Sequence, residues 1–175
     1  MANTRWFLLG ALLLLLPAEA LAQSTYFSAS KEFNGPLASG IDVMSVFNPV
    51  GSGKTLYLDH LQVTMGSAYA REPGFDIWIS NSAGSGCARV IQVKPLNLAA
   101  PTASVVIANA QCVPKPTADP AWNDGPLYQF AGGDHGPRLD LDGIALPPGM
   151  GITIRADWPE VRVDETGHLH LVWRE

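Results

Sequence analysis

The chain has 175 residues, of which 47% are hydrophobic and 15% are charged, and its formal net charge is -5 at pH 7. This composition excludes a disordered chain, because a sequence so apolar and so weakly charged can bury enough surface to offset its ordering entropy. With 11 basic against 16 acidic residues, it also excludes a protein that binds nucleic acid mainly by neutralising phosphates.

The first segment, residues 1–22, has the three parts of a secretory signal peptide. An arginine supplies the positive charge, residues 6–16 are continuously apolar, and a small-x-small pattern ends at Ala22. We therefore predict cleavage between Ala22 and Gln23, which leaves one β-sandwich domain, residues 23–175. The apolar run is too short to span a bilayer, and no cysteine follows the cut for lipid attachment. These features predict a secreted or periplasmic protein with no membrane span in the mature chain.

Beyond the signal peptide, short alternating runs bounded by Gly, Pro, Asn and Asp recur, which is typical of an all-β protein. The predicted strands are residues 41–47, 55–65, 74–80, 88–93, 103–108, 127–130, 138–141, 151–158 and 168–173. The polar, proline-rich segment 114–126 is predicted to be an ordered surface loop. So many short strands in one domain predict an antiparallel two-sheet sandwich with jelly-roll or Greek-key connections, and a closed barrel is the alternative.

The longest predicted strand, residues 55–65, changes its inward face midway. Its apolar residues before Asp59 fall at even positions, and those from Leu61 onward fall at odd positions. Because side chains alternate between the two faces of a strand, this switch predicts a β-bulge or a bend between Asp59 and Leu61.

Cys87 and Cys112 are the only cysteines of the sequence. An oxidising compartment outside the cytosol favours a disulfide between them. Closing a loop of about 26 residues would stabilise the fold by about 3.5 kcal/mol on the chain-entropy relation. Two separate buried thiols are the alternative.

Two turn-rich segments, FNPVGSGKTLYLDHLQV (residues 47–63) and ALPPGMGITIRADW (residues 145–158), precede a terminal LVWRE. Together they resemble a recurrent pattern in small β-rich accessory and structural proteins of phages and prophages. The resemblance implies a non-enzymatic, phage-like β-sandwich that forms oligomers and serves assembly or surface display. The VGSGKT within the first segment is not a nucleotide-binding loop, because Asn48 stands where its first glycine is needed and a strand follows it.

Aromatic residues are the candidates for contact with a ligand or partner. Trp78 lies on the polar side of the predicted strand 74–80, and Trp122 and Tyr128 lie in or beside the proline-rich loop. Exposed aromatic rings stack on sugars or dock on partner proteins. An exposed Trp78 would favour assembly into an oligomer.

Four residues are weak candidates for metal binding. His168 and His170 project from one face of the last predicted strand and could share Zn²⁺ or Cu²⁺. Asp140 and Asp142 could offer oxygen ligands to Ca²⁺. The solvent face of an amphipathic strand and ordinary turn aspartates explain the same patterns, so no metal and no cofactor is predicted.

No catalytic constellation is present in the sequence, which lacks a GxSxG elbow and any spacing that singles out a pair of carboxylates. We therefore expect no enzyme, but an exported structural or binding module. Its expected partner is a second copy of itself or another surface protein, and not nucleic acid. The alternatives are a module that binds glycans through exposed tryptophans and Ca²⁺, and a small secreted hydrolase.

Overall fold

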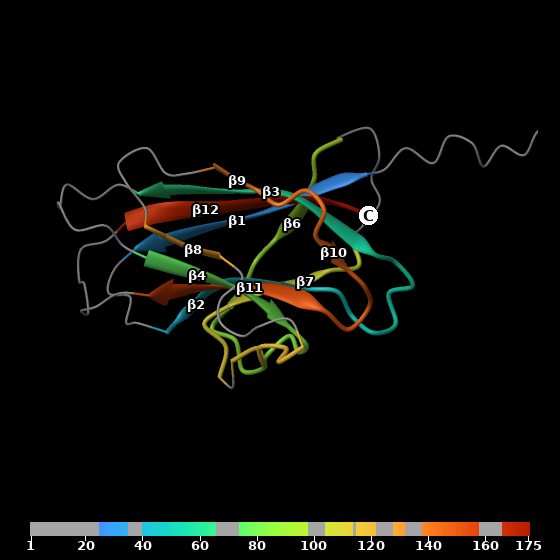
Figure 1. The fold of residues 1–175 in the computed structure, drawn as a ribbon, viewed down its shortest axis with the longest axis horizontal. Helices are drawn as coiled ribbons and strands as arrows, with labels where there is room; N and C mark the ends of the chain where they lie inside the picture. The colour runs from blue at the N-terminus through green and yellow to red at the C-terminus, as the bar shows by residue number, and fades with distance from the viewer. Residues whose placement is uncertain are drawn as a thin grey trace, which may run out of the picture.

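The computed structural model shows an all-β protein in which two antiparallel sheets pack against each other (Figure 1). It describes residues 25–34, 40–65, 74–97, 104–113, 115–121, 128–131, 138–157 and 166–175. These ranges contain no α-helix, and hence none long and apolar enough to cross a bilayer. The predicted signal peptide and its cleavage site lie outside them. The predicted β-sandwich is confirmed, because the described strands form two separate sheets rather than one closed sheet.

Each sheet has a long strand from the end of the chain at its centre (Figure 1). Sheet I contains, in spatial order, β10 (Ala145–Leu146), β3 (Leu56–Met65), β12 (Thr166–Arg174), β1 (Tyr26–Asn34) and β6 (Val93–Pro95), with β9 (Arg138–Asp140) also paired to β3. Sheet II contains, in spatial order, β5 (Arg89–Val90), β7 (Ile107–Ala110), β2 (Asp42–Phe47), β11 (Gly151–Asp157), β4 (Gly74–Ser80) and β8 (Tyr128–Ala131).

The pairing of these strands identifies the sandwich as a jelly roll. The strands β1, β2, β3 and β4 pair in turn with β12, β11, the β9–β10 segment and β8. This is the pattern of one long antiparallel ribbon rolled up so that its successive strands alternate between two sheets. The short strands β5, β6 and β7 come from the connection between β4 and β8 and extend the edges of both sheets.

Most predicted strands overlap observed ones, but two observed strands are missing from the prediction and one predicted strand is displaced. The strand β4 has the predicted bounds, and the predicted strand 88–93 is divided between β5 and β6. The strands β1 and β10 are absent from the prediction, and the predicted strand 103–108 coincides with β7 only at residues 107 and 108. Phe27, Ala29 and Phe33 of β1 are buried and share one parity, but Lys31 interrupts their alternation, and this interruption conceals the strand pattern.

The hydrophobic core fills the space between the two sheets. Its largest fully buried side chains include Trp173, Phe27 and Phe75. The rings of Phe27 and Trp173 stack with their centroids 6.3 Å apart, and Phe33 meets Phe75 edge-on at 5.8 Å. Because β12 and β1 belong to sheet I and β4 to sheet II, the contact between Phe33 and Phe75 joins the two layers.

The predicted irregularity in the longest strand is a β-bulge in β3. Opposite β12, His60 pairs with Val172 and Leu58 pairs with Trp173, which leaves Asp59 as the extra residue. Leu58 and the following Leu61 are therefore both directed into the core, where they are 2% and 0% exposed. The bulge predicted from the change of parity is confirmed.

A covering layer, residues 81–88, 111–113 and 115–119, crosses the outer face of sheet II. The second part of this layer, which starts at Gln111, begins beside β2, where the Gln111 amide donates to the Asp42 carbonyl oxygen at 2.9 Å. It ends beside β4, where the Asp119 amide donates to the Ile79 carbonyl oxygen at 2.9 Å. Because β11 lies between β2 and β4, the segment passes over β11. Figure 1 shows its green and yellow parts together beside β4 and β11.

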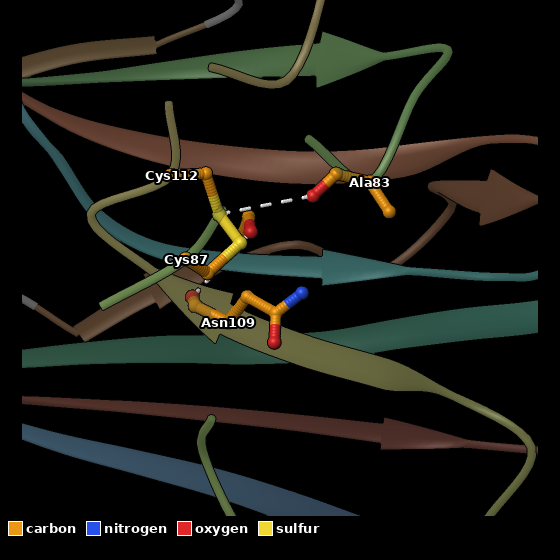
Figure 2. Close-up of a disulfide and its surroundings, with 5 residues drawn as sticks. Ala83, Cys87, Asn109 and Cys112 are labelled. Atoms are coloured by element: carbon orange, nitrogen blue, oxygen red, sulfur yellow. Dashed lines mark hydrogen bonds between the residues drawn. A yellow bond between two sulfur atoms is a disulfide. The ribbon is translucent and has the colours of Figure 1, made fainter. Parts of the chain in front are cut away.

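The disulfide between Cys87 and Cys112 joins the two parts of the covering layer, and its prediction is confirmed. Figure 2 shows the bond beside Asn109 of β7, with the Ala83 carbonyl oxygen 3.9 Å from the Cys112 sulfur. Under this layer, the outward-facing Ser45, Ser80 and Thr153 of sheet II are buried, and Trp78 and Arg155 are half-buried. Sheet II therefore presents little of its outer face to solvent.

Arg155 of β11 connects the covering layer to the sheet. Its Nε donates to Asp42 Oδ1 at 2.9 Å, and its Nη2 donates to the Pro116 carbonyl oxygen at 2.8 Å. Its guanidinium also lies over the Trp78 ring, 5.5 Å from the centroid. Burial raises the pKa of Asp42, and the hydrogen bond and charge of Arg155, with the charge of Lys115, oppose this without cancelling it.

Candidate functional site

The outer face of sheet I carries a regular array of side chains, most of them polar or aromatic, in which Ser28 and Val172 are buried. Because Phe27 and Ala29 point into the core, the alternate residues of β1 point outward, and the register extends this face across the sheet. From β1 through β12 to β3, the rows of neighbouring outward residues are Tyr26–Arg174–Tyr57, Ser28–Val172–His60, Ser30–His170–Gln62 and Glu32–His168–Thr64. Lys94 of β6 extends the second row on one side, and Asp140 of β9 extends it on the other.

The first row places an arginine between two exposed tyrosines. Tyr26 and Tyr57 are 40% and 46% exposed, which ranks them among the exposed large hydrophobic residues of the described chain. The Arg174 guanidinium carbon lies 5.1 Å from the centroid of the Tyr57 ring. Such a cation–π contact holds both side chains in place and leaves apolar ring surface and polar groups available together. The row forms an aromatic platform on a sheet face.

Beside this row lies a cluster of histidines from two strands. The ring centroids of His60 and His170 are 6.4 Å apart, and the Ser30 hydroxyl lies 2.7 Å from His170 Nδ1. His60 Nδ1 lies 3.3 Å from both Arg138 Nη2 and Asp59 Oδ2. A neutral His60 can accept a hydrogen bond from Arg138 there, whereas a protonated His60 donates to Asp59. His60 Nδ1 therefore has a hydrogen-bond donor and an acceptor within reach on the same face.

Partial burial lowers the pKa of His170 below its usual 6.5, and the charges of His168 and His60 lower it further. Near neutral pH, His170 is therefore uncharged and accepts or donates hydrogen bonds as a neutral ring. His170 thus adds a hydrogen-bonding group to the face without adding a positive charge near neutral pH.

The structure places the four candidate metal ligands on or near this face. His168 and His170 share the outer face of β12, as their spacing predicts, and Asp140 lies opposite His60 on β9. The amide of Asp142 donates to Asp140 Oδ1 at 3.0 Å, which is the geometry of an aspartate turn. Across the described ranges, no three His, Cys, Asp or Glu side chains are arranged to hold a metal ion.

The candidate aromatic residues are not gathered on this face. Trp78 lies on the outer side of β4 in sheet II, where it is half-buried and packs against Arg155. Trp122 and the side chain of Tyr128 lie outside the described part of the chain. Among the residues that the structure describes, the exposed aromatic side chains are Tyr26 and Tyr57, which the sequence patterns did not single out. The sequence does contain a signal for them. Each tyrosine alternates with apolar residues that are buried, so its side chain is expected to point outward.

In comparisons with known proteins, no family model, no curated protein and no solved structure matches the chain.

Proposed function

We propose that this protein is an exported, non-catalytic binding module that assembles with a second copy of itself through the outer face of sheet I. The observation that carries the proposal is the Tyr26–Arg174–Tyr57 row. Tyrosine and arginine are enriched at protein interfaces and supply much of their binding energy. The two sheets also differ, since the protein's own covering layer occupies the outer face of sheet II, whereas these tyrosines of sheet I are exposed.

The row is suited to contact with its own copy. In a two-fold dimer, the same patch of each copy contacts the other. The patch must therefore contain both partners of every favourable contact, such as a cation and an aromatic ring. Here the patch offers both partners of a cation–π contact, because Arg174 can stack on a tyrosine of the other copy. The resemblance of the turn segments to oligomeric phage and prophage proteins supports the same role.

Light scattering during size-exclusion chromatography tests this proposal. The wild-type protein is expected to elute as a dimer or larger oligomer at high concentration, and the Tyr26→Ser/Tyr57→Ser variant is expected to elute as a monomer. Val90→Ser is the matched control, because Val90 is 85% exposed but lies on sheet II. A strictly monomeric wild type, or an equal effect of the control, would refute assembly through this face.

A carbohydrate-binding module is the second candidate, and the aromatic platform favours it specifically. Tyrosine rings on a flat sheet face can stack on sugar rings, and the neighbouring Ser30, Gln62 and His170 offer hydrogen bonds to hydroxyl groups. A glycan array probed with the wild type and the Tyr26→Ser/Tyr57→Ser variant separates the two candidates. Binding by the wild type that the variant loses would support the carbohydrate role, and a blank array would refute it.

A further inference from the structure

A cleft of about 530 Å³ opens at the side of the sandwich, between the edge of sheet I and the edge of sheet II. On one side it is lined by residues 30–33 of β1, and on the other by residues 89–92 together with Val43 and Gln111. The strand β6 pairs only with residues 27–29 of β1, so the cleft lies along β1 beyond the end of β6. Cavities of this size hold small organic ligands.

Two cationic residues, Lys31 and Arg89, line this cleft. They occupy inward-facing strand positions, which are apolar where the two sheets pack directly on each other. Lys31 has the parity of Phe27, Ala29 and Phe33, which are buried in the core. Arg89 pairs with Ala110, which is 0% exposed and also belongs to the core. Both side chains therefore lie on the inward-facing side of their strands at the open edge of the sandwich, where Lys31 is half-buried and Arg89 is exposed.

The charges in the cleft are only partly balanced. The Lys31 ammonium donates to the Glu32 carbonyl oxygen at 2.6 Å, and Arg89 makes no salt bridge with any acid among the described residues. Partial burial, followed by the positive charge of Arg89, lowers the pKa of Lys31, while Glu32 raises it. The two cations thus repel each other, and an anionic group between them would be attracted by both.

The cleft is also lined by the Ser30 hydroxyl, the Glu32 carboxylate and two primary amides. Gln92 and Gln111 both line it, and Gln111 has a φ of 54°, a left-handed conformation that is uncommon for a residue other than glycine. Residues held in such conformations cluster at binding sites, where the surrounding structure enforces them. Primary amides donate and accept hydrogen bonds together, which suits them to the hydroxyl groups of a sugar.

We propose that this cleft binds a small acidic saccharide, whose carboxylate or sulfate group lies between Lys31 and Arg89. The site is separate from the aromatic platform and does not depend on assembly. Arginine forms bidentate hydrogen bonds with planar carboxylates, and lysine adds a point charge. The glutamine amides would bind the hydroxyl groups of the ring.

Isothermal titration calorimetry of the full mature chain tests the proposal with three probes: glucuronate, inorganic sulfate and glucose. Glucuronate and sulfate are expected to bind the wild type, and glucose is expected not to bind. Lys31→Met should weaken glucuronate binding by about tenfold, because it removes one charge-assisted contact. Lys94→Met is the matched control, since Lys94 is an exposed lysine of the same sheet that points to the outer face. It should change the affinity by less than about twofold.

Each other outcome would overturn the proposal. Absence of glucuronate binding to the wild type would leave Lys31 and Arg89 as inward charges that only protect a sheet edge from aggregation. Equal weakening by Lys31→Met and Lys94→Met would show non-specific attraction to positive charge. Equal binding of glucose and glucuronate would show a site without charge recognition, and sulfate binding alone would exclude the saccharide. Circular dichroism of each variant verifies folding, and Arg89→Met replaces Lys31→Met if the latter does not fold.

Discussion

Replacing Arg155 by methionine should strongly destabilise the protein, because it leaves the buried Asp42 carboxylate without its hydrogen-bonded ion-pair partner. The Asp42 side chain is 0% exposed, and that of Arg155 is 20% exposed, so solvent screens their interaction little. Methionine keeps much of the aliphatic volume of the arginine and removes its charge and its donors. The substitution therefore isolates the electrostatic role of Arg155 from its packing.

The expected loss follows from the contacts of Arg155. The hydrogen bond to Asp42 is charge-assisted and contributes about 1.5–3 kcal/mol. The bond to the Pro116 carbonyl oxygen contributes about 1 kcal/mol, and the contact with the Trp78 ring adds about 0.5–1 kcal/mol. The free energy of unfolding should thus fall by about 3–5 kcal/mol, the range expected when one partner of a buried ion pair is removed.

The loss should also depend on pH in a defined direction. Arg155 opposes the burial that raises the pKa of Asp42, so the pKa of Asp42 should rise further in the variant. When the folded-state pKa of an acid is raised, its ionised form destabilises the folded state at pH values above that pKa. This destabilisation disappears as the pH falls and the acid becomes protonated. The difference between wild type and variant should therefore shrink as the pH falls from about 7 to about 4.5.

Urea unfolding followed by tryptophan fluorescence and by far-ultraviolet circular dichroism measures both effects. Arg138→Met is the control, since Arg138 is an exposed arginine on sheet I and its loss should change stability by less than about 0.5 kcal/mol. A loss below about 1 kcal/mol for Arg155→Met would show that the pair contributes little to stability. A difference that stays constant with pH would refute the assignment of the loss to Asp42.

Three further predictions concern other parts of the fold. Replacing both cysteines of the disulfide by serine should lower the free energy of unfolding by about 3.5 kcal/mol and raise the urea m-value, because the unfolded chain expands; an unchanged midpoint would contradict this. Acidification below pH 6.5 should destabilise the protein partly through His170, whose folded pKa is lowered, so His170→Gln should flatten the dependence of the melting temperature on pH. Gly167→Ala should cost about 1–3 kcal/mol in thermal unfolding, because the added methyl group would overlap the Phe33 ring. Gly51→Ala, with no atom within 4 Å of the added group, should be nearly neutral.

Local alternation was sufficient to predict most of the fold. Each long strand other than β1 has an inward set of apolar residues with turn formers on both sides, and the bulge at Asp59 follows from a change of parity that the sequence shows directly. The strand β1 escaped prediction because Lys31 stands in its inward row. The structure explains this exception, since that position faces the cleft at the open edge rather than the packed core.

The candidate site was much less predictable, because it depends on register between distant strands. The common face of His168 and His170 follows from their spacing on one strand. In contrast, the row of Tyr26, Arg174 and Tyr57 combines three strands, and no local pattern fixes how those strands align. For Trp78, the local pattern predicts the direction of the side chain but not its burial. Its parity indicates an outward position, but only the tertiary structure shows that a distant segment of the chain covers that face.

The placement of β11 and β12 has a consequence for how the chain folds. These last two long strands lie between β2 and β4 and between β1 and β3, so each joins neighbours from early in the chain. Neither layer can be completed before β11 and β12 have been synthesised, and such non-local pairing makes folding slow. Until those two strands are present, β2 lacks its neighbour β11 and β1 and β3 lack the strand between them.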